Sequence, residues 1–223
     1  MKKPDITLFV GPTAYGVRRE LLQHEDVLLK PPVRRGDIEK LLAEDQSTRT
    51  IVIADGTFHS FPAVGHAEIR QAVEAGWIVW GLCSMGALRA AEMRSIGVRG
   101  FGEVYRRYLD NPDLDDDEVA LLHASEAPHR PMSEPLIHIR AFVDHLVARN
   151  HITQDSGIEV IDSLKHRWYV ERTIPLLRSL LGSMAACDEQ ILTAEIEKFD
   201  TYRLKQNDLV RFMEEEPWKE RAR

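Results

Sequence analysis

The sequence predicts an α/β protein, with a parallel-sheet core and flanking helices followed by a mainly helical C-terminal part. Apolar runs without polar alternation, at residues 6–10, 50–54 and 77–82, are typical of strands buried on both faces. A loop and helix-forming residues follow each run, and this repeat gives parallel strands with right-handed crossovers. Beyond residue 130 the apolar residues recur at helical spacing. We therefore expect an α/β core over residues 1–130 and a helical region over residues 131–223 packed on it.

Prolines, glycines and capping residues mark the ends of several core elements. Pro31 and Pro32 end a second short strand, at residues 26–29, because consecutive prolines form a stiff extended segment. Asp37 is a candidate N-cap for the helix that follows, and Gly76 closes the helix before the 77–82 strand. The remaining expected elements are helices over residues 17–23, 37–44, 63–75, from 87 onward and over 104–109, and a further strand over 119–123.

The helical region begins with Ser133-Glu134-Pro135, which is a typical helix start. Apolar residues from Leu136 to Val147 then keep a helical period. The other helices are expected over residues 155–164, 174–181, 188–199 and 201–214.

Composition excludes several classes of function. The formal net charge of -7 and the pI near 5.7 give no general attraction for nucleic acid or anionic membranes. The two cysteines lie far apart in sequence, which gives neither a disulfide framework nor a zinc-binding spacing. No apolar run approaches the roughly 20 residues of a membrane span, and the first residues show no signal-peptide pattern. We expect a cytoplasmic protein without metal or cofactor, and a homo-oligomer stays open.

Two stretches resemble ligand sites only in part. The loop after residues 6–10 contains glycines but matches neither the dinucleotide-binding nor the P-loop spacing, and its Thr13 is either a ligand contact or a cap. The acidic run at residues 113–118 would suit a divalent cation, yet the EF-hand spacing is absent, so a solvated or capping loop is the other interpretation.

Residues 77–92 are the most informative stretch of the chain. A buried strand turns at Cys83 and Ser84 directly into helix formers from Ala87 onward, which places Ser84 at a strand's carboxyl end and at a helix N-terminus. This is close to a nucleophile elbow, although Leu82 replaces the first glycine of the G-x-S-x-G pattern. Ser84 is therefore either a helix cap or a nucleophile.

Several local patterns together resemble the TfuA-like family. The patterns are Phe9-Val-Gly-Pro12, Pro31-Pro32 with Gly36-Asp37-Ile38, Asp55-Gly56-x-Phe58 with Pro62-Ala63-Val64-x-His66-x-Glu68-Ile69, Ser84-Met-Gly-Ala-Leu-Arg-Ala-Ala-Glu92, and Asp116-Asp117-Glu118-Val119-Ala120. The resemblance covers about residues 5–140, and Tyr169-Val-Glu-Arg172-Thr173 resembles a recurring element beyond them. Family members often carry a basic residue where this chain has Ala67, which puts in doubt that this helix donates a catalytic base.

The resemblance implies a function in peptide backbone thioamidation. TfuA-like proteins work beside YcaO enzymes, which activate a peptide amide with ATP, and together they replace the amide oxygen by sulfur. The resemblance implies that the sulfur comes from a ThiS-type protein, which carries it as a C-terminal thiocarboxylate. The TfuA-like protein is implied to hydrolyse this thiocarboxylate with a Ser-Lys pair and to release sulfide.

Under this interpretation Ser84 is the nucleophile, and the N–H groups of Met85 and Gly86 stabilise the oxyanion. We expect Lys165 to be the base, with Lys30 as the other candidate, because the remaining lysines lie on helix surfaces or near the chain ends.

His66 is an alternative base, with Glu68 or Asp55 orienting it. Arg89 is expected either to bind the carboxylate tail or to pair with Glu92 or Asp55. A narrow diglycine tail would enter a slot lined by backbone, with Gly56 among the glycines near the strand ends.

Other interpretations remain open. Cys83 is either a small buried hydrophobe or a persulfide carrier. The protein could also be a non-catalytic adaptor that docks the sulfur donor or peptide substrate onto the YcaO enzyme, or it could bind a phosphate at its glycine loops.

Overall fold

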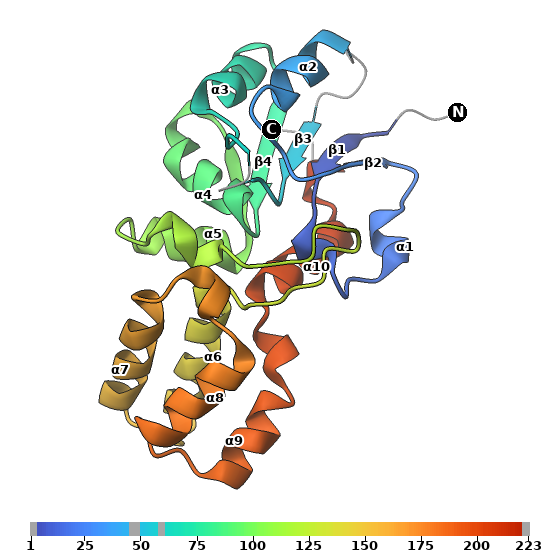
Figure 1. Cartoon of the computed structure of the whole chain (residues 1–223). Coiled ribbons are helices and arrows are strands. Elements are labelled where there is room, and N and C mark those ends of the chain that lie inside the picture. The colour runs from blue at the N-terminus through green and yellow to red at the C-terminus, as the bar shows by residue number, and fades with distance from the viewer. Residues whose placement is uncertain (1–3, 45–49, 58–60, 220–223) are drawn as a thin grey trace. The chain divides into compact units, whose positions relative to one another are not determined.

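A five-stranded parallel sheet forms the core of the first part of the chain (Figure 1). The computed structural model describes residues 4–44, 50–57 and 61–219, so Phe58 of the sequence pattern lies outside the described residues. The strand order is β2-β1-β3-β4-β5, and every neighbouring pair is parallel. The strands are β1 (Ile6–Phe9), β2 (Val27–Lys30), β3 (Thr50–Ile53), β4 (Ile78–Leu82) and β5 (Arg99–Phe101).

The expected fold class is confirmed, but one strand was not predicted and one predicted strand is absent. The glycine-containing loop after residue 97 includes the short strand β5, whose central Gly100 leaves room for the ring of Tyr105 at 2.1 Å from where a Cβ would stand. The strand expected over residues 119–123 is absent, because the acidic run folds as the 3-10 helix η3 (Asp116–Val119). Its end makes only an isolated bridge between His123 and Pro131.

Helices cover both faces of the sheet. Phe9, Ile51 and Val79 point to one face and pack with α2, α3 and α4, and the other face packs with α1 and α10 through Leu209 and Phe212. The helices and short 3-10 turns of this part are η1 (Pro12–Ala14), α1 (Arg19–Leu22), α2 (Asp37–Glu44), α3 (His66–Glu74), α4 (Met85–Glu92), η2 (Arg94–Ile96), α5 (Gly102–Asp110), α10 (Leu204–Glu215) and η6 (Pro217–Lys219).

The chain divides into two compact units, and the first unit is discontinuous. Residues 1–114 and 205–223 form the first, and residues 115–204 form the second. This division differs from the expected boundary at residue 130 in two places: the acidic run belongs to the helical unit, and α10 belongs to the unit with the sheet. The reason is the packing of α10, whose apolar residues belong to the same core cluster as strand residues of the sheet.

The second unit is a helical bundle with its own core. Phe142, Leu164, Leu177 and Leu192 are fully buried members of that core. Besides η3 its elements are α6 (Leu136–Ala148), α7 (Gln154–Lys165), η4 (Tyr169–Glu171), α8 (Ile174–Ser183), α9 (Glu189–Ile196) and η5 (Phe199–Tyr202). The helix expected over residues 201–214 therefore begins three residues late, because η5 occupies residues 199–202.

The first turn of α4 lies against the sheet with no side chain between them. A Cβ on Gly86 would stand 1.6 Å from the carbonyl oxygen of Ile53, and a Cβ on Gly81 would stand 2.0 Å from the carbonyl oxygen of Gly86. Both distances are far below van der Waals contact, so glycine is required at both positions. These two residues fix the height of the α4 N-terminus above β3 and β4.

We expect Gly86→Ala to destabilise the protein by at least about 3 kcal/mol, because the new methyl group would overlap backbone that cannot move aside. Thermal unfolding measures the effect. Gly182→Ala is the matched control, since Gly182 lies near the end of α8, and a Cβ added to it would meet no atom within 4 Å. That change should be neutral or stabilise by up to about 1 kcal/mol through helix propensity. Similar stability of the two variants would contradict the role given to Gly86.

Candidate active site

Asp55 is the most heavily bonded side chain at the carboxyl edge of the sheet. It follows β3 and is 3% exposed. Its Oδ2 accepts hydrogen bonds from the N–H groups of Gly11 at 2.8 Å and Thr13 at 2.9 Å, and its Oδ1 accepts one from the Thr13 hydroxyl at 2.6 Å. Asp55 and Thr13, both expected to contact substrate, therefore contact each other. Together they fix the loop after β1 against the end of β3.

Ser84 lies at the end of β4, next to Asp55 in the sheet. Its N–H donates to the carbonyl of Ala54 at 3.2 Å and to that of Leu82 at 2.8 Å. The preceding residue, Cys83, has a φ of 65°, a left-handed conformation that is uncommon for a residue other than glycine. Backbone in such a conformation costs of order 1–3 kcal/mol and is concentrated at functional sites. The strained turn presents Ser84 at the N-terminus of α4, as the nucleophile-elbow pattern predicts.

The capping interpretation of Ser84 is not supported by its hydrogen bonds. Ser84 occupies the N-cap position of α4, but its side chain makes no capping hydrogen bond. Among the N–H groups expected to bind an oxyanion, that of Gly86 donates to the Ala54 carbonyl at a long 3.5 Å. The N–H of Met85 donates to no group in the part of the chain that the structure describes. The hydroxyl and at least one backbone donor are thus available for a ligand.

Lys205 is the buried amine of this edge. It lies in the first turn of α10, is 2% exposed, and has its Nζ 4.0 Å from Oδ1 of Asp55. The sequence argument missed it by setting aside the lysines near the chain ends. A signal was present, because Lys205 falls at the same helical spacing as the buried Leu209 and Phe212.

Asp208 is a second buried charge on α10, three residues after Lys205. Its two carboxylate oxygens accept hydrogen bonds from the N–H groups of Glu103 at 2.7 Å and Val104 at 2.9 Å, in the first turn of α5. Burial raises the pKa of Asp208 to about 6, in spite of these two hydrogen bonds and the positive charge of Arg211. No motif in the sequence pointed to this residue.

The pKa of Cys83 depends on the charges that surround the turn before α4. Its pKa is raised well above the usual value, first by burial and then by the carboxylates of Asp208 and Asp55, whereas the ammonium of Lys205 opposes the shift. The sulfur is therefore held as a thiol, and the thiolate is the reactive form of cysteine. The persulfide interpretation loses support, and the same three charges act on the residue adjacent to Ser84.

His66 and Arg89 share one partner, which is Glu92. Oε2 of Glu92 lies 2.9 Å from Nε2 of His66 and 2.6 Å from Nη1 of Arg89. Among the described residues no hydrogen bond or ion pair joins His66 or Arg89 to Ser84 or Asp55. Of the two partners expected for Arg89, the structure has Glu92.

Glu68, one of the two carboxylates expected to orient His66, binds backbone N–H groups instead. Glu68 is buried, and it accepts hydrogen bonds from the N–H groups of Gly65 at 2.8 Å, Gly36 at 3.0 Å and Ile38 at 3.3 Å. It caps α3 and the start of α2. Because its oxygens are already bound to these backbone donors, Glu68 does not orient His66 as expected. His66, with a side chain 52% exposed, pairs instead with Glu92.

The two lysines expected to act as the base are both more exposed than Lys205. Lys165 belongs to the second unit, where its Nζ is 2.9 Å from Oδ2 of Asp115. The hydrogen bond and the charge of Asp115 raise the pKa of Lys165, which favours the ammonium form that cannot accept a proton. Lys30 is exposed at the end of the edge strand β2.

Gly56 lies under α4, since a Cβ on it would stand 2.8 Å from the Met85 side chain.

The acidic run holds the helical unit together instead of forming an open cation site. Asp117 accepts a hydrogen bond from Nη2 of Arg172 at 2.6 Å, and Glu118 binds Arg140 through both of its oxygens. Arg172 is fully buried and also donates to the carbonyl oxygens of Leu164 and Arg167 at the end of α7. The two sequence patterns at 116–120 and 169–173 are therefore two halves of one ion-pair network.

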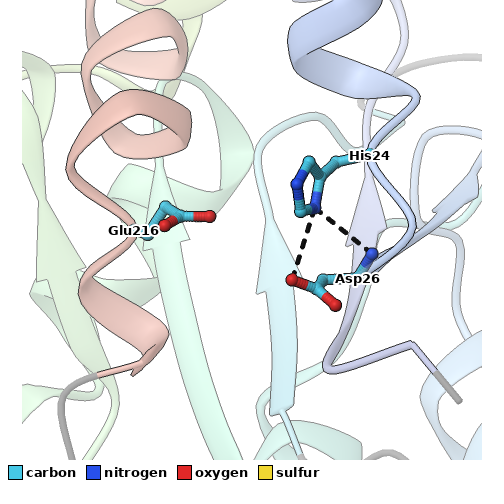
Figure 2. A group of neighbouring side chains, drawn as sticks. All are labelled: His24, Asp26 and Glu216. Atoms are coloured by element: carbon cyan, nitrogen blue, oxygen red, sulfur yellow. Dashed lines mark hydrogen bonds and ion pairs between the residues drawn. The ribbon is translucent and has the colours of Figure 1, made fainter. Parts of the chain in front are cut away.

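One further cluster has the donor types of a metal site. His24, Asp26 and Glu216 each place a potential ligand atom within 4.8 Å of the others, and Figure 2 shows the Glu216 carboxylate directed toward the adjacent His24 and Asp26 side chains. The ammonium of Lys219 lies 3.3 Å from Oδ2 of Asp26 and 2.6 Å from Oε1 of Glu216. Because this one cation contacts both carboxylates, the cluster is described as a network of ion pairs.

The carboxyl edge of the sheet thus gathers the parts that acyl transfer requires. These are a hydroxyl at a strained turn, an available N–H at a helix N-terminus, and a buried amine beside a carboxylate. The hydroxyl follows β4, the N–H belongs to α4 and the amine to α10, and all three lie in the first unit.

Comparison with known proteins identifies one family. The sequence model of the family described as TfuA-like protein matches residues 55–173, which is more than half of the chain. The match begins at Asp55 and ends one residue after Arg172. A search of the curated proteins found no match. No helix in the described ranges is both long and apolar enough to cross a membrane.

We expect Arg172→Met to lower the free energy of unfolding by about 3–5 kcal/mol, because it leaves Asp117 and the carbonyls at the end of α7 without their buried donor. Urea unfolding measures the loss. Arg178→Met is the control, because Arg178 makes a partly exposed ion pair with Glu189 and should contribute less than about 1 kcal/mol. Equal losses in the two variants would show that the network is not essential to the fold.

Proposed function

Because the chain belongs to the TfuA-like family, we propose that it hydrolyses a thiocarboxylated carrier protein of the ThiS type and supplies the sulfide to a YcaO enzyme for peptide backbone thioamidation. The observation that supports the proposal is that the first unit contains both Ser84, whose hydroxyl makes no capping hydrogen bond, and the buried Lys205, whose Nζ lies 4.0 Å from Asp55 at the end of the neighbouring strand. A serine hydrolase needs a nucleophile and a base, and the family resemblance implies that a lysine serves as that base.

In the proposed reaction Lys205 first gives one proton of its ammonium group to solvent. Ser84 Oγ then attacks the thiocarboxylate carbon, and the hydroxyl proton passes to the Lys205 amine. The tetrahedral intermediate is stabilised by the N–H of Met85, a type of contact worth about 3–4 kcal/mol in comparable hydrolases. The C–S bond then breaks, and sulfide leaves with the proton. Water hydrolyses the acyl-enzyme, so that thiocarboxylate and water give carboxylate and hydrogen sulfide overall. Asp55 orients Lys205 from the end of β3.

The layout suits the expected substrate. A thiocarboxylate is an anion, and the N-terminus of α4 carries the positive end of a helix dipole. Cytoplasmic location belongs to the proposal as well, because YcaO partners and reduced cysteines fit that compartment; both cysteines of the chain are free.

We expect Ser84→Ala to lower the rate of sulfide release by at least about 10³-fold while costing less than about 1 kcal/mol of stability, since the hydroxyl makes no capping bond. A thiocarboxylated ThiS-type protein is incubated with this chain alone, and mass spectrometry follows the exchange of sulfur for oxygen at its C-terminus. Lys205→Met should be as impaired as Ser84→Ala.

Lys165→Met separates the two lysines in the same assay. If Lys165→Met is inactive and Lys205→Met is active, the base assigned above is wrong. If Ser84→Ala releases sulfide at a near-normal rate, Ser84 is excluded as the nucleophile. If the wild type releases no sulfide, hydrolysis is excluded, and the remaining function is that of an adaptor that docks the sulfur donor onto the YcaO enzyme.

A further inference from the structure

We propose that Asp208 is a positioning residue of the Ser84 site, which holds Lys205 against Asp55 by fastening the first turns of α10 to the N-terminus of α5. The inference rests on the proposed function in taking Lys205 as the base. Its structural part stands on contacts within the first unit.

The two buried charged residues of α10 make contacts beyond two different strands. Lys205 and Asp208 are three positions apart and therefore lie on the same side of the helix. Lys205 reaches Asp55 after β3, whereas Asp208 reaches Glu103 in the helix that follows β5. The start of α10 thus lies across the carboxyl edge of the sheet and is held at two points.

The contact at Asp208 is closely fitted. The N-cap residue of α5, Phe101, provides no capping side chain, and Asp208 caps that helix from the distant part of the chain. Gly102 has a φ of 94°, and a Cβ on it would stand 2.2–2.5 Å from the Asp208 carboxylate. A side chain at 102 would be strained by the positive φ and would push the Asp208 carboxylate away from its position at the start of α5.

Stability alone does not explain an acidic residue here. Burial raises the pKa of Asp208 to about 6, which is above its usual value. The protonated side chain therefore stabilises the folded state below the usual pKa, and this stability is lost as the pH rises through 6 and Asp208 ionises. Arg211 on α10 favours the charged form and Glu103 on α5 opposes it, while Lys205, Asp55 and Cys83 are the other titratable groups nearby. A carboxylate retained at this cost is expected where it serves the site.

The experiment measures the exposure of Lys205 directly, with an amine-acylating reagent at neutral pH and mass spectrometry of the labelled peptides. In the wild type Lys205 should be labelled slowly, since it is 2% exposed, and Lys40, with a side chain 72% exposed, serves as the internal reference. Asp208→Asn should speed the labelling of Lys205 relative to Lys40 by about tenfold, because local opening of α10 becomes easier.

Asp188→Asn is the matched control. Asp188 caps α9 in the second unit by accepting hydrogen bonds from the N–H groups of Gln190 and Ile191, so the same chemical change is made at a cap of the other unit. It should lower the melting temperature without changing the labelling of Lys205. Unchanged labelling in Asp208→Asn, or an equal increase in Asp188→Asn, would overturn the proposal.

Hydrolysis of the thiocarboxylated carrier gives a second readout. Asp208→Asn should lower kcat by about 10²-fold, the cost of a misplaced catalytic group, with KM within about twofold of the wild type. A rise in KM at unchanged kcat would contradict a positioning role. If the wild type releases no sulfide, the proposed function fails, and the labelling rates still decide whether Asp208 holds Lys205.

Discussion

The contact between the first turn of α4 and the sheet is made by backbone, and the geometry of the whole edge depends on it. Gly81 and Gly86 let the helix approach until the Gly86 Cα lies against the carbonyl of Ile53. Because the helix starts this close, the chain has only Cys83 and Ser84 in which to reverse direction after β4, and Cys83 takes a left-handed conformation to do so. A looser fit would let Ser84 relax into an ordinary capping residue with its hydroxyl bound to the helix.

Asp55 performs a second joining function at the same edge. The loop after β1, the end of β3 and the start of α10 come from three distant parts of the chain, and one carboxylate binds groups from the first and last of them. Buried charges are tolerated when they are paired and hydrogen-bonded, and Asp55 meets both conditions. The residues expected to contact substrate thus divide into those that hold the edge together, Asp55 and Thr13, and those left available for chemistry, Ser84 and Met85.

Local pattern was sufficient for the parallel sheet and for the place of Ser84, because neighbouring residues determine buried strands and helix starts. It failed where the decisive partner lies far along the chain. The acidic run was ambiguous until Arg172 and Arg140 were seen to bind it, and the pairing of His66 with Glu92 rests on the packing of α3 beside α4. Lys205 is the clearest example. Its spacing from the apolar residues of α10 can be seen in the sequence, but the sequence does not show that α10 returns to the sheet and buries this lysine beside Asp55.

The discontinuity of the first unit also determines when the site can exist during biosynthesis. A ribosome completes all of residues 115–204 before it adds Lys205, and domains tend to fold as they emerge, the N-terminal one first. The nascent sheet therefore carries Ser84 and an Asp55 carboxylate that still lacks its lysine, without α10 over its apolar face, until the helical unit has been synthesised. The order of translation thereby delays assembly of the lysine with the serine, and the exposed face makes the nascent chain a candidate for chaperone binding during that interval.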